Sequence, residues 1–114
     1  MVGKIYLAKI YFTDLSAYKI RPVLVIKQLD EDCVCLQLTS QEKNHKIIIT
    51  NKDLTDGSLK KSSLVVVPKN FTLHHSVLFK YIATIRENRL SEIFKTFCIE
   101  IGCTDNHKNY AKTT

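Results

Sequence analysis

The stretch Tyr-Phe-Thr-Asp-Leu-Ser-Ala-Tyr-Lys-Ile-Arg-Pro-Val-Leu-Val-Ile, residues 11–26, decides the fold. Its last four residues are apolar and mostly β-branched, which is typical of a strand buried on both faces. Arg21 and Pro22 stand at the expected start of this strand, where a proline is tolerated because its missing N–H interrupts the ladder least. A strand is expected to end near Phe12, and Thr13–Ile20 to form a loop. The pattern therefore predicts a core strand with one cation fixed at its entrance.

Further short strands are expected on both sides of this stretch, because apolar and β-branched runs alternate with turn residues. The expected strands are 4–12, 23–28, 33–38, 46–50, 64–67 and 77–85. The polar residues 29–32 predict a hairpin turn, and 51–59, which contain Asp-Gly, predict a longer turn. Pro68 is expected to end the strand before it. So many short strands favour a small barrel or a strongly bent sheet.

From Asn88 onward the apolar period becomes that of a helix. The residues that fall on one helical face are Leu90, Ile93, Phe94, Phe97 and Ile101. We expect a helix over about 89–101, with Gly102 after its end. Residues 103–114 are polar and predict a flexible tail. The fold class is thus mainly β with a C-terminal helix, in one domain over residues 1–102.

Composition limits the classes of function. The formal charge of +6 and the pI of about 9.2 favour anionic partners such as nucleic acid or an acidic protein. No signal peptide or membrane span is expected, which favours the cytoplasm. Cys33 and Cys35 predict buried free thiols, because their spacing does not match a zinc site. Adjacent residues such as His74 and His75 point in different directions, so we expect no metal site and no cofactor.

Two polar clusters are expected to meet at one edge of the sheet. If 23–28 and 33–38 form a hairpin, its centre lies near residue 30, and 21 + 39 = 60 places Arg21 beside Thr39. A guanidinium can donate two parallel hydrogen bonds to a phosphate and stabilise charge on a five-coordinate phosphorus. A neighbouring hydroxyl can relay a proton. Alternatively, Arg21 solvates a strand end and Thr39 bonds the local backbone, as such residues commonly do.

Several segments, taken in order, resemble the MazF/PemK family of type II toxins. They are Phe12-Thr13-Asp14-Leu15-Ser16, Lys19-Ile20-Arg21-Pro22-Val23-Leu24-Val25-Ile26, Leu38-Thr39-Ser40-Gln41, Leu59-Lys60-Lys61-Ser62-Ser63-Leu64-Val65, and Phe71-Thr72-Leu73 through to Ile82-Ala83-Thr84-Ile85. The likeness covers roughly residues 3 to 100. The loop before Arg21 is shorter than the family's longer version, so its RNA contacts cannot be transferred in detail.

The resemblance implies an SH3-like barrel of the MazF, CcdB and Kid type, working as a homodimer in the cytoplasm. It implies a metal-independent endoribonuclease that cuts single-stranded RNA and leaves a 2′,3′-cyclic phosphate, together with an acidic antitoxin and nucleic-acid binding that extends to DNA. Arg21 would stabilise the phosphorane and Thr39 would assist proton transfer. The residues expected to touch RNA are Ser16, Tyr18, Lys19, Ser40 and Gln41. The alternatives are a catalytically silent binding module of the same fold and a topoisomerase poison like the CcdB relatives.

Overall fold

The fold is a curled antiparallel sheet with one helix beside it. The computed structural model describes residues 1–11, 16–41 and 47–102. Its seven strands are ordered β4-β6-β3-β2-β1-β7-β5. The elements are β1 (Lys4–Tyr11), β2 (Tyr18–Gln28), β3 (Asp32–Thr39), β4 (Ile47–Ile49), the 3₁₀ turn η1 (Asn51–Asp53), β5 (Leu54–Gly57), β6 (Ser63–His74), the 3₁₀ turn η2 (His75–Val77), β7 (Leu78–Ile85) and α1 (Glu87–Glu100).

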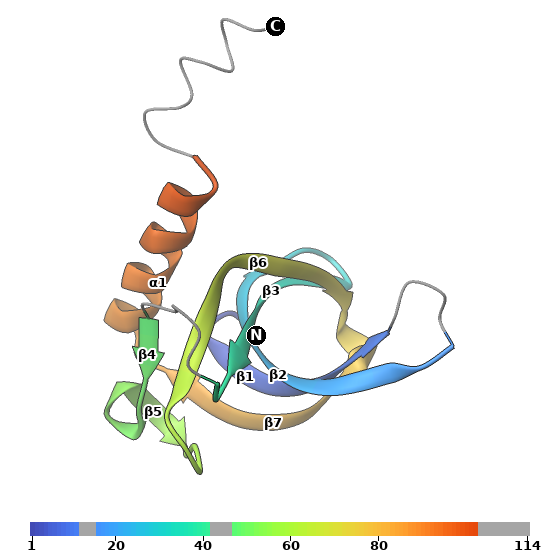
Figure 1. Ribbon diagram of the computed structural model, residues 1–114, viewed down its shortest axis with the longest axis horizontal. Coiled ribbons are helices and arrows are strands. Elements are labelled where there is room, and N and C mark those ends of the chain that lie inside the picture. The colour runs from blue at the N-terminus through green and yellow to red at the C-terminus, as the bar shows by residue number, and fades with distance from the viewer. Residues whose placement is uncertain (12–15, 42–46, 103–114) are drawn as a thin grey trace, which may run out of the picture.

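Figure 1 shows the sheet curling round on itself, with β6 arching over one side of the ring and β7 lying on the opposite side. The helix α1 stands outside this ring, next to β4. The Arg89 guanidinium ties the two together, because its Nη2 donates to the carbonyl oxygen of Ile48 at 2.8 Å. This arrangement confirms the predicted class, a mainly β fold with a C-terminal helix. No helix among the described residues is long and apolar enough to cross a membrane.

The strand β2 begins earlier than the sequence predicted. It starts at Tyr18, which pairs with Tyr11 of β1, so the prediction of a loop up to Ile20 is wrong. The sequence of residues 18–20 is typical of a loop because the side chains on both faces are exposed. Pairing with β1 nevertheless holds these residues in an extended conformation. Arg21 therefore lies within the strand and not at its entrance. Pairing with β3 begins only at Val23, so Pro22 sits where β2 has one described neighbour, as at a sheet edge. Residues 13–15 of the predicted loop, and residue 12 of the predicted strand before it, lie outside the described part of the chain.

The hairpin of β2 and β3 has the predicted register. Val23 faces Gln37, a pair whose numbers sum to 60, and the turn is closed by the Leu29 N–H donating to the Asp32 carbonyl at 2.8 Å. Farther toward the turn, a bulge shifts the pairing. The pairs from Val23↔Gln37 to Val25↔Cys35 keep the predicted sum of 60.

Pro68 does not end a strand, because β6 runs on to His74. The pairing of β6 with β3 jumps between Leu36↔Asn70 and Leu38↔Val65, so the proline falls inside an irregularity of the ladder. A bulge is one of the few places in a sheet that accept a residue without an N–H, and it also bends the strand. Residues 70–75 were expected to form a loop or a short extended piece, and they are strand as far as His74.

The predicted turn over 51–59 contains a further strand, β5, which pairs with β7. Its sequence Leu-Thr-Asp-Gly has a turn-like composition, and for this reason its strand character was missed. The turn η1 before it is closed by Asp53, whose carboxylate accepts the Thr50 N–H at 2.9 Å. The strand β7 follows a second short turn, η2. There the rings of His74 and His75 stack with centroids 4.4 Å apart, contrary to the expectation that they point in different directions.

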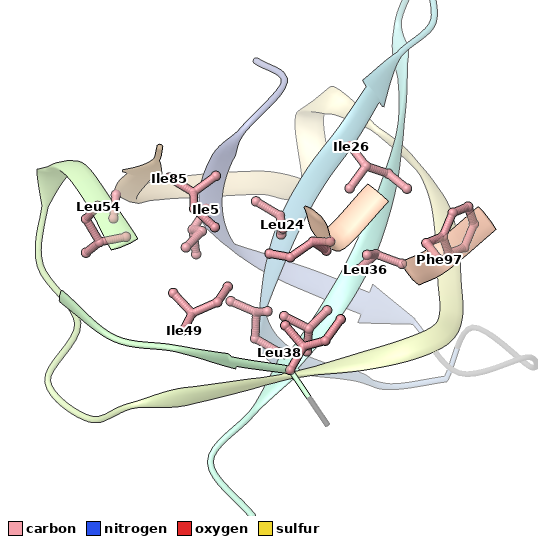
Figure 2. Packing of buried hydrophobic residues seen from close by; sticks show 13 residues of the cluster. Ile5, Leu24, Ile26, Leu36, Leu38, Ile49, Leu54, Ile85 and Phe97 are labelled. Carbon is pink, nitrogen blue, oxygen red and sulfur yellow. The ribbon is translucent and has the colours of Figure 1, made fainter. Parts of the chain in front are cut away.

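The main hydrophobic core lies between the sheet and α1. Figure 2 shows side chains of β1, β2, β3 and the helix converging there, and its labelled members are Ile5, Leu24, Ile26, Leu36, Leu38, Ile49, Leu54, Ile85 and Phe97. A smaller cluster, Ala8, Val23, Val25, Cys33 and Cys35, packs on the other face of the same strands. Val23 and Leu24 belong to different clusters, as expected for alternate faces of a doubly covered strand.

The helix α1 starts slightly before the expected position and ends one residue earlier. Ile93 and Phe97 of its predicted apolar face are buried in the main core, and Leu90 packs against it. Phe94 and Ile101 remain 41% and 43% exposed, so only part of the face contacts the sheet. Residues 103–114, predicted to form a tail, lie outside the described part of the chain.

Candidate functional site

A basic cavity of about 310 Å³ lies on the sheet around Arg21 and is called here the Arg21 cavity. Its lining residues are Ile10, Lys19, Arg21, Gln37, Lys69 and Phe71. Three of the six are cations and none is a carboxylate. Its volume is at the lower end of the roughly 300–1,000 Å³ that is typical of small-ligand pockets. The composition suits a small anionic group next to a flat apolar one.

Four strands build this cavity. Ile10 of β1 lies directly opposite Lys19 of β2, and Arg21 is the next residue along β2 on the same face. Gln37 of β3 lies opposite Val23, two residues farther along that face. Phe71 of β6 stands opposite Cys35 of β3 and brings an aromatic ring to the cavity. All these side chains project from the face that carries the smaller hydrophobic cluster, so a packed layer supports them.

The electrostatics of the Arg21 cavity are dominated by positive charge. The Arg21 guanidinium is half-buried and its Nη1 donates to the carbonyl oxygen of Ile20 at 3.1 Å, which leaves its remaining N–H groups to other acceptors. The Lys69 ammonium lies over the Phe71 ring, 5.6 Å from the ring centroid. Like charges gathered in one small space repel one another, so an anion bound among them is favoured.

Thr39 lies just beyond the Arg21 cavity and does not line it. If the register of Val23 with Gln37 is continued by two residues, Arg21 and Thr39 fall beside each other on one face of the sheet. The Thr39 hydroxyl accepts the N–H of Gln41 at 3.2 Å, so in this structure it also closes a local turn. Accepting that bond leaves the hydroxyl proton available to a ligand. Ser40 and Gln41 are exposed at the same edge.

Three residues before Arg21 were predicted to touch RNA, and the structure places them differently. Lys19 lines the Arg21 cavity, whereas Tyr18 is on the other face, where its ring lies 5.4 Å from that of Tyr11 and 5.2 Å from the Lys9 ammonium. Ser16 is exposed in the connection between β1 and β2. The structure therefore groups Lys19, and not Tyr18 or Ser16, with Arg21.

Sequence reasoning missed Gln37, Lys69 and Phe71. In the predicted hairpin the numbers of paired residues sum to 60, which pairs residue 23 with 37 as well as 21 with 39. Gln37 could therefore have been predicted as a neighbour of Arg21. Lys69 and Phe71 follow Pro68, where the strand was expected to end and to give way to a loop or a short extended piece. Nothing in the sequence indicated that β6 crosses the proline and returns to β3.

The two buried cysteines of β3 are not candidates for nucleophiles. Cys33 and Cys35 are free and buried, as predicted. Burial, reinforced by the neighbouring Cys33, raises the pKa of Cys35 to about 12. A thiol with such a pKa stays protonated at neutral pH, whereas nucleophilic and metal-binding chemistry needs the thiolate. These side chains serve as small apolar residues of the second cluster.

The structure thus defines a small, mainly β protein, with a curled sheet, a C-terminal helix and a cation-rich cavity across neighbouring strands. The family model described as PemK-like, MazF-like toxin of type II toxin–antitoxin system matches residues 2–101. The chain therefore belongs to this toxin family, which implies an antitoxin partner, and toxins of the family generally cleave RNA. No curated protein matches the chain.

Proposed function

We propose that this toxin is an endoribonuclease that cleaves single-stranded RNA at the Arg21 cavity without a metal ion. The observation that carries the proposal is the grouping of three cations, Lys19, Arg21 and Lys69, around one aromatic ring, Phe71. Cations suit the phosphates of RNA, and an aromatic ring suits an unstacked base. Membership of a family that generally cleaves RNA supports the same reading.

In this mechanism the 2′-hydroxyl of the RNA attacks the adjacent phosphorus and the 5′-oxygen leaves. The products are a 2′,3′-cyclic phosphate and a 5′-hydroxyl. The Arg21 guanidinium donates to the phosphate oxygens and stabilises the charge that builds on the five-coordinate phosphorus. A guanidinium is not deprotonated in proteins, so Arg21 does not act as the base. Thr39 assists proton transfer through its hydroxyl, and Lys19, Ser40 and Gln41 hold the flanking nucleotides.

The proposal extends to the partners of the toxin. The antitoxin is acidic, which complements the charge of +6. The toxin works as a homodimer, and exposed apolar side chains such as Phe94 of α1 and Ile101 just after it are consistent with further contacts between proteins. An RNA substrate and an antitoxin are both consistent with a cytoplasmic location. Light scattering of the purified toxin tests the dimer, and a mass of one chain would contradict it.

The test is digestion of a mixed-sequence single-stranded RNA in EDTA, with both ends of the fragments mapped. We expect fragments with 2′,3′-cyclic phosphate and 5′-hydroxyl ends, and a loss of roughly 100- to 1,000-fold in kcat for Arg21→Ala. Thr39→Ser should retain more activity than Thr39→Ala, because serine keeps a hydroxyl. Arg86→Ala is the matched control, since Arg86 is an exposed arginine at the start of α1.

Cleavage that survives Arg21→Ala, or that needs an added metal ion, would contradict the mechanism. Binding of RNA without any cleavage would instead favour the catalytically silent binding module. Relaxation or trapping of supercoiled DNA complexes in a gyrase assay, without RNA cleavage, would favour the topoisomerase poison.

A further inference from the structure

Gln37 differs in chemistry from the other side chains of the Arg21 cavity. Among the described residues that line the cavity, it is the one whose side chain both donates and accepts hydrogen bonds. The three cations are donors alone, and the other two lining side chains have no polar atom. Gln37 is half-buried in β3, and its amide makes no hydrogen bond within the described part of the chain. The proposed mechanism assigns no part to this amide, which is open to a ligand.

Gln37 lies between Arg21 and the aromatic ring of Phe71. Its strand, β3, is flanked by β2 on one side and by β6 on the other. Across β2, Gln37 is paired with Val23, which is two residues from Arg21 on the same face. Across β6, Phe71 is paired with Cys35, which is two residues from Gln37 on the same face. Such diagonal neighbours lie about 7–8 Å apart, within reach of long and aromatic side chains.

The ladder between β3 and β6 is interrupted beside Gln37. Leu36 is paired with Asn70 but Leu38 with Val65, so Gln37 faces the stretch of β6 in which the pairing shifts. Lys69 belongs to this stretch and lines the Arg21 cavity together with Gln37. A bulge bends its strand and re-aims the side chains next to it. The irregularity therefore gives the Gln37 amide an open space on the side of β6.

The donors and acceptors of the cavity match a base that offers more acceptors than donors. Donors are abundant, whereas the Gln37 Oε1 is the single side-chain acceptor among the described lining residues. The pairing edge of uracil or cytosine carries two acceptors and one donor, which one acceptor satisfies. The pairing edge of guanine carries two donors, of which one would stay unmatched at a cost in affinity. The opposite edge of guanine carries acceptors alone and would leave Oε1 unmatched.

We propose that Gln37 determines base specificity by hydrogen-bonding the pairing edge of a pyrimidine that lies against the Phe71 ring. Oε1 accepts from N3–H of uracil or from the amino group of cytosine, and Nε2 donates to the adjacent O4 or N3. Because Arg21 is a diagonal neighbour of Gln37, the base belongs to a nucleotide attached to the phosphate that Arg21 contacts. The assignment to RNA rests on the proposed function, whereas the choice of base rests on the donors and acceptors of the cavity.

The test measures the binding of a single base without cleavage. The probes are short fluorescein-labelled 2′-O-methyl oligonucleotides in which one central uracil, cytosine, adenine or guanine stands among abasic residues. A further probe is abasic throughout. All the probes carry the same phosphates, so differences in affinity come from the base. Anisotropy with the full-length toxin should show the uracil and cytosine probes binding at least roughly fivefold more tightly than the adenine and guanine probes.

Substitutions separate recognition of the base from stacking and from folding. Gln37→Met keeps the length of the side chain but removes both polar groups of the amide, so the preference for pyrimidines should fall to roughly twofold or less. Its affinity for the abasic probe should stay at the wild-type value, which a merely structural role of Gln37 would not allow. Gln28→Met is the matched control, because Gln28 is exposed near the far end of β2, and it should keep the wild-type preference. Phe71→Leu should weaken all four base probes toward the abasic one.

Gln37→Glu gives a second, independent comparison if Gln37→Met does not fold by circular dichroism. A carboxylate accepts hydrogen bonds and does not donate them, so it suits the two donors on the pairing edge of guanine. In this variant the guanine probe should therefore bind more tightly than the uracil and cytosine probes, although the added negative charge weakens every probe. The same comparison can be made with the free base order reversed, because each ratio is taken within one variant.

The proposal is overturned if the wild type binds purine probes as tightly as pyrimidine probes, or if Gln37→Met keeps the wild-type preference. It is also overturned if Gln37→Met weakens the abasic probe as much as the uracil probe. A wild-type preference for guanine would assign the amide to a different base and contradict the choice of a pyrimidine. A toxin that binds none of the probes, the abasic one included, would overturn the proposed function as well.

Discussion

Phe71 offers the sharpest test of the Arg21 cavity, because its ring and the adjacent Lys69 have separable effects on RNA binding. The Phe71→Leu substitution keeps an apolar side chain of similar size at a half-buried position but removes the aromatic face. Stacking of one base on an aromatic ring contributes about 1–3 kcal/mol, which corresponds to roughly 5- to 150-fold in affinity. Because the Phe71 ring is only partly exposed, we expect a loss near the middle of this range, about tenfold.

The matched substitution is Lys69→Gln, which removes the ammonium that lies 5.6 Å from the Phe71 ring centroid. Each phosphate that a lysine neutralises on single-stranded nucleic acid contributes about 0.7 to the slope of log K against log salt concentration. Lys69→Gln should therefore lower this slope by about 0.7, whereas Phe71→Leu should weaken binding without changing it.

The assay is fluorescence anisotropy with a labelled 2′-O-methyl oligonucleotide, titrated at several salt concentrations. The methyl group blocks the attacking hydroxyl, so binding is measured without cleavage. If Phe71→Leu binds with wild-type affinity, no base stacks on the ring and the assignment of the cavity to RNA fails. If Phe71→Leu changes the salt slope as much as Lys69→Gln, the separation of stacking from charge is refuted.

Two further predictions concern stability. Because the pKa of Cys35 is about 12 in the folded chain, the unfolded thiol loses its proton first as the pH rises. The free energy of unfolding should therefore fall above about pH 9, by up to about 1.4 kcal/mol per pH unit from this group. Urea titrations of wild type and Cys35→Ala at pH 8 and 10 should show a smaller fall in the variant, and equal falls would contradict the assignment. Gly57 has φ of 76°, and a Cβ there would lie 2.2 Å from the Ile82 carbonyl oxygen. Gly57→Ala should lower the free energy of unfolding by at least about 2 kcal/mol, whereas the control Ser58→Ala should change it little. If Gly57→Ala unfolds at the same urea concentration as the wild type, β5 shifts to accommodate the Cβ and the argument is refuted.

The sequence predicted those parts of the fold in which a local pattern of residues is sufficient to determine the secondary structure. The run Val23–Ile26 predicted a buried strand, the helical spacing predicted α1, and the hairpin sum predicted the register of Val23 with Gln37. The errors arose where tertiary pairing overrides local preference. β5 has turn-like residues but pairs with β7, and β6 passes through Pro68 because a bulge accommodates the proline.

The same distinction explains the candidate site. Arg21 and Lys19 could be predicted from one stretch of sequence because they lie on one face of one strand. Lys69 and Phe71 reach the cavity only because β6 crosses a proline and pairs with β3, a long-range contact that no local pattern reports. Tyr18 was predicted to touch RNA while β2 was thought to start later, and the earlier start assigns it to the face opposite Arg21.

The position of Arg21 inside β2 bears directly on how it could act. A side chain in a mobile loop must be ordered when RNA binds, at a cost in conformational entropy. Arg21 projects instead from a strand paired with β1, beside Val23, which is fully buried. A guanidinium held in this way needs little reorganisation to meet a developing phosphorane, which is the condition under which electrostatic stabilisation is most effective.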